Sequence, residues 1–171
     1  MASGSPGLSS GSSFVNLLGV VDYGVGNMRS VANALNRIGV DWEIAQRPSD
    51  LPRFRRLLLP GVGAFGAAMF SLAESGLKDS LVDAAENGVP VLGICLGMQL
   101  LSEHSEESPG VPGLGLIAAQ TRAVTPGVAT NTGFRRVRFP AGEGEAATII
   151  GEKDYYFNHS FHVLPAAADL V

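Results

Sequence analysis

The stretch GICLGMQLL (Gly93–Leu101) contains Cys95, the only cysteine among 171 residues. It is preceded by an apolar run, VPVLGI, that predicts a strand, and it leads into LGMQLLSE, whose pattern predicts a helix. Cys95 therefore stands at a sharp turn from a strand to a helix, where many enzymes hold a nucleophile. GICLG also has the spacing of the G-x-S-x-G nucleophile elbow, with sulfur in place of oxygen.

The residue types around Cys95 fit nucleophilic chemistry. Flanking glycines let neighbouring backbone pass closely, and the start of a helix favours the thiolate, which is the form that attacks a carbonyl. The backbone N–H of Leu96 is a candidate oxyanion donor. Gln99 lies four residues on, so its amide is expected on the same side as Cys95, where a bound substrate could pair with it. The alternative is that Cys95 is only a small buried apolar residue.

The rest of the chain predicts an α/β fold around this turn. Apolar runs predict four strands, and they alternate with segments of helical periodicity, which indicates a parallel sheet with flanking helices. The strands are expected at Val15–Asp22, Val40–Ala45, Phe54–Pro60 and Val89–Ile94, and the helices after Met28 (ending at Gly39), around Met69, over Leu77–Glu86 and over residues 96–103. From Leu114 onward, GLGLIAAQ, FRRVRF, ATIIG and DYYFNHSFHVL predict a smaller antiparallel sheet. Residues 102–113 are interpreted as a solvated surface loop.

The loop PGVGAFG (Pro60–Gly66), which follows the third predicted strand, is the candidate for a second oxyanion donor. Loops at the carboxyl ends of parallel strands gather at one edge of the sheet, so this loop is expected beside the Cys95 turn. The N–H groups of Val62 and Gly63 are the candidate donors. A simple tight turn is the alternative.

Composition excludes several classes of function. The 171 residues fit one domain, and 46% hydrophobic residues with 22 glycines and 10 prolines suit a compact α/β protein. A net charge of −4 gives no reason to bind nucleic acid or an anionic membrane, and no apolar run approaches the roughly 20 residues that span a bilayer. One cysteine and three histidines offer neither a disulfide framework nor a metal cluster.

The chain is thus expected to be a cytoplasmic protein without a metal or other cofactor. Residues 1–13, rich in serine and glycine, are interpreted as a flexible tail or a remnant of a cloning sequence, and residues 14–171 as the domain.

Four separated stretches closely resemble the glutaminase subunit of imidazole glycerol phosphate synthase, a class I (triad-type) glutamine amidotransferase of histidine biosynthesis. They are DYGVGNMRSVANAL, LLLPGVGAFGAAM, PVLGICLGMQLLSEHSEE and YYFNHSFHV, and they occur in the order of that family. The resemblance implies the flavodoxin-like fold of class I amidotransferases.

The resemblance also implies roles. Cys95 would attack the side-chain amide carbon of glutamine, and the backbone of Val62, Gly63 and Leu96 would serve the oxyanion. Glutamine would be held by five residues: Gly63, Gln99, His159, Ser160 and Phe161. Ammonia would pass to a (β/α)₈-barrel cyclase subunit. Three residues would lie toward that partner: Asn27, Phe134 and Tyr156.

The sequence departs from the family in two places. The family's His-Pro-Glu segment, which supplies the general base and its orienting carboxylate, does not occur in the 171 residues, so we expect this chain to be a poor catalyst. His159 and His162 are expected on opposite faces of one strand, and His104 in an acidic loop. TNTGFRR (Thr130–Arg136) also stands where the family usually has Pro-His-Met-Gly-Trp-Asn, with Phe134 in place of tryptophan.

Three functions remain open. The first is the glutaminase half of a two-subunit synthase. The second is a catalytically incomplete docking subunit that binds glutamine or the cyclase without turnover. The third is another enzyme with the same elbow, such as the glutaminase of vitamin B6 synthesis, against which GVGAFG and DYGVGN argue.

Overall fold

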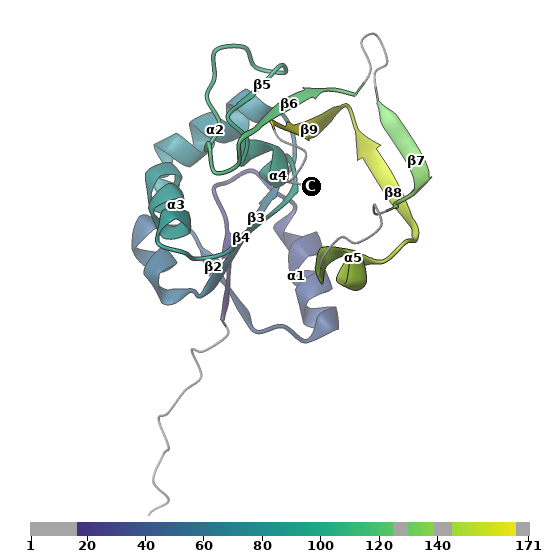
Figure 1. Ribbon diagram of the computed structural model, residues 1–171. Helices are drawn as coiled ribbons and strands as arrows, with labels where there is room; N and C mark the ends of the chain where they lie inside the picture. Colours follow the sequence, from purple (N-terminus) through teal and green to yellow (C-terminus); the bar gives the residue numbers. More distant parts are fainter. Residues whose placement is uncertain (1–16, 125–129, 139–144, 167–171) are drawn as a thin grey trace, which may run out of the picture. The chain divides into compact units, whose positions relative to one another are not determined.

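The computed structural model describes residues 17–124, 130–138 and 145–166 (Figure 1). These residues form two compact units. The first combines the chain up to Gly63 with Ala67–Met98, and the second combines Ala64–Gly66 with the chain from Gln99 onward.

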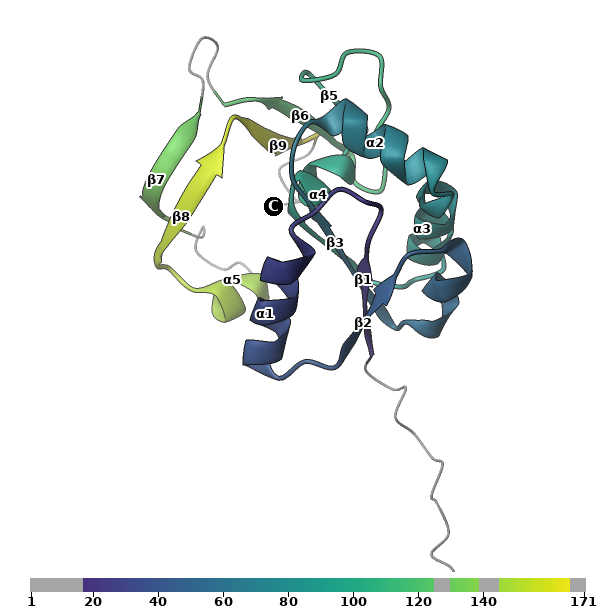
Figure 2. The same ribbon diagram turned by 180° about the vertical axis from the view of Figure 1, so that it is seen from behind.

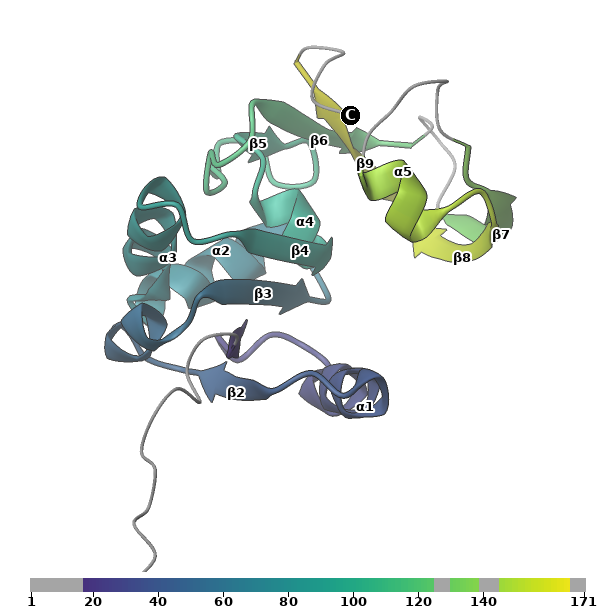
Figure 3. The same ribbon diagram turned by 60° about the horizontal axis from the view of Figure 1, so that its bottom comes forward.

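The first unit is built on a parallel sheet of four strands. The strands are β1 (Leu18–Val21), β2 (Trp42–Ala45), β3 (Arg56–Gly61) and β4 (Val91–Cys95). They pair in the order β2-β1-β3-β4, which Figure 3 shows with β2 and β4 at the two edges. The parallel sheet predicted from the sequence is therefore confirmed, and β4 brings Cys95 to its carboxyl edge.

Helices cover both faces of this sheet. They are α1 (Met28–Ile38), α2 (Phe65–Glu74) and α3 (Leu77–Glu86), with a 3₁₀ helix η1 (Pro48–Arg53) after β2. α1 lies on one side of the sheet and α3 on the other (Figures 1 and 2). Under α1, Val20, Leu35 and Leu58 form a buried cluster. Gly39 ends α1 in the left-handed conformation, at φ 71°, as the sequence predicts.

The second unit contains mixed and antiparallel strands. β5 (His104–Ser105) pairs parallel to β6 (Ala119–Ala123), which pairs antiparallel to β9 (Phe161–Pro165). β7 (Asn131–Arg136) and β8 (Asp154–His159) form a separate antiparallel pair. The helix α5 (Glu145–Ile150) lies between them in the chain, and α4 (Leu96–Leu100) joins the two units.

Two predicted strands of this unit are wrong in part. ATIIG forms the end of α5, because weak alternation and β-branched residues are only a slight preference that the preceding Glu and Ala residues outweigh. In GLGLIAAQ only the end is a strand. Its earlier N–H groups bond to the carbonyls of Leu100, Leu101 and Ser102, so they do not join a ladder.

The surface loop expected over residues 102–113 is also only partly a loop. Ser102 and Ser105 are buried, and β5 begins at His104. Burial is tolerated because the polar groups are paired. Ser102 Oγ donates to the carbonyl of Gln99 at 2.7 Å and lies 3.0 Å from the hydroxyl of Thr121.

Candidate functional site

Cys95 is the last residue of β4, and Leu96 is the first residue of α4. The cysteine has φ 56°, the one positive φ of a non-glycine residue in the described ranges, and its side chain is exposed. Such a conformation is strained for an L-residue and is concentrated at functional sites. The turn therefore presents the thiol to solvent, as the elbow spacing predicts.

The glycines on either side of Cys95 are required by space. A Cβ at Gly97 would lie 1.8 Å from the carbonyl oxygen of Leu59, and a Cβ at Gly93 would lie 2.5 Å from the backbone of Met98. Real side chains do not approach so closely. The prediction that these glycines allow a close backbone approach is confirmed.

The predicted oxyanion loop begins beside this turn. In the β3–β4 pair Gly61 is the partner of Cys95, so the segment that continues to Val62 and Gly63 starts next to the cysteine. Val62 is about half exposed, and Gly63 has φ +95°. Leu96, whose backbone N–H is the third candidate, has a buried side chain. Whether these N–H groups bind an oxyanion stays a prediction.

α4 is shorter than the helix predicted over residues 96–103. It ends at Leu100, because the chain turns at Ser102 to enter β5 and Ser102 binds the carbonyl of Gln99. Five residues carry a smaller dipole than the full helix assumed from the sequence. An anion at this turn would therefore be stabilised by local backbone N–H groups and not by the dipole of a long helix.

Three of the residues predicted to hold glutamine meet in the second unit. The carbonyl oxygen of Phe161 accepts a hydrogen bond from Gln99 Nε2 at 3.3 Å and contacts His159 Nδ1 at 2.9 Å. The partner expected for the buried Gln99 amide from a substrate is thus supplied, at least in part, by Phe161. Ser160 lies between His159 and Phe161 in the chain, and its backbone carbonyl accepts a hydrogen bond from the N–H of Val124.

His159 is held at both ring nitrogens. Nδ1 faces a carbonyl oxygen, which can only accept, so Nδ1 carries the proton; Nε2 then accepts from the amide of Asn131 at 3.2 Å. This arrangement fits a positioning role better than that of a free base. His159 and His162 also lie in different strands, β8 and β9, because the chain bends at Ser160. The expectation that they share one strand is therefore wrong.

The first turn of α2 is capped by two residues of the segment 102–113, which was expected to be a solvated loop. The N–H of Phe65 donates to Glu107 Oε2 at 2.7 Å, and the N–H of Gly66 donates to Ser108 Oγ at 3.0 Å. These caps satisfy N–H groups that a helix start leaves free. Each cap joins residues that are 42 positions apart in the sequence, so no local sequence pattern predicts it.

The residues predicted to face a partner subunit are exposed. Phe134 and Tyr156 are directly opposite each other in the β7–β8 pair and make an edge-to-face contact at 5.4 Å between ring centroids. Their exposed fractions are 70% and 60%. Asn27 has a local role as well, since its side chain accepts from the N–H of Ser30 and caps α1.

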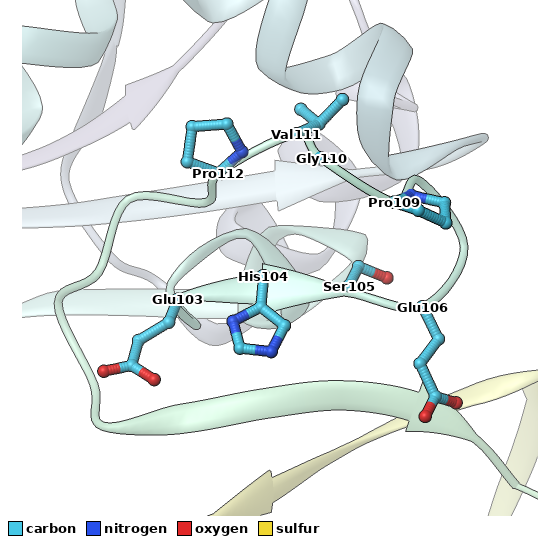
Figure 4. A pocket seen from close by; sticks show the side chains of 8 residues that line it. All are labelled: Glu103, His104, Ser105, Glu106, Pro109, Gly110, Val111 and Pro112. Carbon is cyan, nitrogen blue, oxygen red and sulfur yellow. The ribbon is translucent and has the colours of Figure 1, made fainter.

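A pocket of about 760 Å³ lies elsewhere in the second unit, along residues 103–106 and 109–112 (Figure 4). Glu103, His104 and Glu106 extend to the same side of this segment. None of the predicted site residues lines the pocket. Within the described ranges, no three His, Cys, Asp or Glu side chains gather as a metal site would need, and no helix is long and apolar enough to cross a membrane.

Comparisons with known proteins agree with one another. The CobB/CobQ-like glutamine amidotransferase domain family matches residues 31–146. The imidazole glycerol phosphate synthase subunit HisH of Moorella thermoacetica is 39% identical, covering 90% of this chain and 74% of its own length. HisH of Deinococcus radiodurans is 41% identical, with coverages of 84% and 68%.

Solved structures share the fold. A glutamine amidotransferase crystal structure superposes with a TM-score of 0.66 at 21% identity, covering 84% of this chain and 71% of the other. PurLQS from Thermotoga maritima gives 0.61 at 20% identity, with coverages of 90% and 71%. The fold expected of a class I amidotransferase is thereby confirmed.

Proposed function

Because the chain belongs to the HisH family of glutamine amidotransferases, we propose that it hydrolyses glutamine through a thioester on Cys95 and supplies ammonia to a cyclase subunit. The observation that carries the proposal is the exposed, strained Cys95 between two glycines that admit no side chain. A competing docking role without turnover has no comparable observation in its favour.

The proposed reaction has two halves. The Cys95 thiolate attacks the side-chain amide carbon of glutamine, forming a C–S bond and an oxyanion. The group that took the thiol proton returns it to the amide nitrogen, and collapse of the intermediate then breaks the C–N bond and releases ammonia. Water then attacks the thioester, which releases glutamate and regenerates the thiol. The N–H groups of Val62, Gly63 and Leu96 would stabilise the two oxyanions, and each such donor typically contributes about 2.7–4 kcal/mol.

Glutamine would be held by Gly63 together with Gln99 and the residues 159–161. The shared acceptor at the Phe161 carbonyl supports this assignment, because it fixes the Gln99 amide and the His159 ring at once. Fixed polar groups bind a small polar substrate with little loss of entropy. The acceptor of the thiol proton is assigned to the family's His-Pro-Glu segment, which does not occur in these residues.

The partner would be a (β/α)₈-barrel cyclase that uses the ammonia to make imidazole glycerol phosphate and AICAR in cytoplasmic histidine biosynthesis. Asn27, Phe134 and Tyr156 would face it. Exposed aromatic side chains of this kind are enriched at protein interfaces and depleted on surfaces that stay in water, which supports the assignment.

The test is ammonia release from glutamine by the 171-residue chain, alone and with the cyclase and its ligand. A matched chain extended by a relative's His-Pro-Glu segment supplies the base. We expect release that depends on the partner, more of it from the extended chain by about 10²–10⁴-fold, and loss to background in Cys95→Ala. If neither chain releases ammonia while both still bind the cyclase, the glutaminase proposal is wrong and the chain is a docking subunit.

A further inference from the structure

Tyr23 connects the turn after β1 to the predicted oxyanion loop. Its side chain is 3% exposed, and its hydroxyl donates to the carbonyl oxygen of Pro60 at 3.0 Å in a fully buried hydrogen bond. Pro60 lies near the end of β3, two residues before Val62. The Tyr23 hydroxyl thus fixes the carbonyl of Pro60, which lies just before the candidate donors at Val62 and Gly63.

Tyr23 is held at its hydroxyl and at its backbone. Its oxygen lies so close to Gly61 that a Cβ there would be 2.6 Å from it. The backbone carbonyl of Tyr23 accepts a hydrogen bond from the hydroxyl of Ser71 in α2. The buried ring and the anchored backbone thus leave the hydroxyl directed at the Pro60 carbonyl.

The phenol also stays neutral. Burial raises the pKa of Tyr23 above its usual range, and the nearby Cys95 raises it further. Tyr23 therefore remains a hydrogen-bond donor at all physiological pH values. The hydroxyl also adjoins Gly61, the residue that pairs with Cys95 in the β3–β4 ladder.

We propose that Tyr23 is a positioning residue that holds the Pro60–Gly63 segment in the orientation from which its N–H groups stabilise the oxyanion formed at Cys95. The proposal rests on the proposed glutaminase activity. Fixing the Pro60 carbonyl fixes the plane of the Pro60–Gly61 peptide, and the next two peptides are linked to it directly. Donors act only within about 2.7–3.1 Å of the oxyanion, so small rotations of this segment reduce their effect.

The variant Tyr23→Phe keeps the ring and removes the donor. The matched control is Tyr155→Phe, which also removes a tyrosine hydroxyl that donates to a backbone carbonyl, that of Ile150 on the exposed side of the second unit. Ser71→Ala is a second, milder variant, because it loosens Tyr23 without touching the phenol. Unfolding midpoints show that each variant is folded.

Two measurements test the proposal, the first on the 171-residue chain and the second on its extended form. The first is amide hydrogen exchange of the peptide that covers residues 59–64, which needs no activity. In Tyr23→Phe we expect about tenfold faster exchange there, in Ser71→Ala a smaller increase, and in Tyr155→Phe none. The second is glutamine turnover with the cyclase and its ligand, on the chain extended by the His-Pro-Glu segment, where we expect kcat to fall about 10- to 100-fold with KM nearly unchanged.

The outcomes are distinct. Faster exchange with a loss confined to kcat supports the proposal. Exchange equal to that of the unsubstituted chain, a kcat equal to that of Tyr155→Phe, or a loss that appears in KM alone overturns it. If the unsubstituted chain releases no ammonia in any state, the proposed function fails, and the exchange measurement alone decides whether Tyr23 holds this segment.

Discussion

Gly97 is the residue at which the elbow depends most directly on the absence of a side chain. A Cβ there would lie 1.8 Å from the carbonyl oxygen of Leu59, a backbone atom in the centre of the sheet that cannot move aside. We therefore expect Gly97→Ala to lower the free energy of unfolding by about 3 kcal/mol or more. Urea unfolding monitored by fluorescence measures this loss.

The control is Gly26→Ala, where the nearest atoms to a new Cβ lie at 3.8 and 3.9 Å, an ordinary contact distance. We expect this change to alter stability by less than about 1 kcal/mol. Equal losses for the two variants would mean that the elbow is not crowded as described.

Residue-level prediction from the sequence succeeded where the signal was local. Cys95 and its flanking glycines lie within five positions, so their spacing alone predicts a strained turn with close backbone packing. Tyr23 was missed, because its hydrogen bond to Pro60 joins residues 37 positions apart. Gln99 was recognised as an amide that needs a partner, but no local signal points to its contact with Phe161, 62 residues away.

At the level of elements, the N-terminus of α2 depends on the loop that follows α4. Glu107 and Ser108 accept hydrogen bonds from the first two N–H groups of α2, and the Glu107 carboxylate also faces the positive end of that helix. We expect Glu107→Ala to lower the free energy of unfolding by about 1–2 kcal/mol and Ser108→Ala by about 1 kcal/mol. Thermal unfolding followed by circular dichroism measures both.

Glu103→Ala is the matched control, since Glu103 is an exposed carboxylate of the same segment that caps no helix. It should leave the unfolding midpoint within about 1 °C of the original. A loss for Glu103→Ala as large as that for Glu107→Ala would show that the acidic segment acts through its total charge and not by capping.

Elements were predictable in the first unit and less so in the second for a physical reason. Buried parallel strands such as β1 and β3 are continuous apolar runs, and α1 and α3 have clear periodicity and caps. In ATIIG the pattern is short and weakly alternating, and it ends as helix α5. Short segments of this kind take their structure from tertiary contacts that periodicity does not record.

At the scale of the whole molecule, an interface to a partner needs an exposed apolar centre. In the proposed assembly Phe134 and Tyr156 would provide one on the β7–β8 pair, where their rings contact each other and remain mostly exposed. Their contact stabilises each ring's orientation before binding, which reduces the entropy lost when a partner covers them. The TNTGFRR segment would therefore supply an aromatic anchor through Phe134.

We expect Phe134→Ala and Tyr156→Ala each to weaken binding of the cyclase about 10- to 100-fold, with the double variant losing less than the product, because the two rings support one another. Isothermal titration calorimetry with the cyclase measures the dissociation constants. Ile149→Ala is the control, since Ile149 is a similarly exposed apolar side chain in α5. If all three single variants bind equally well, the aromatic pair is not the docking centre, and the affinity must come from other exposed residues such as Asn27.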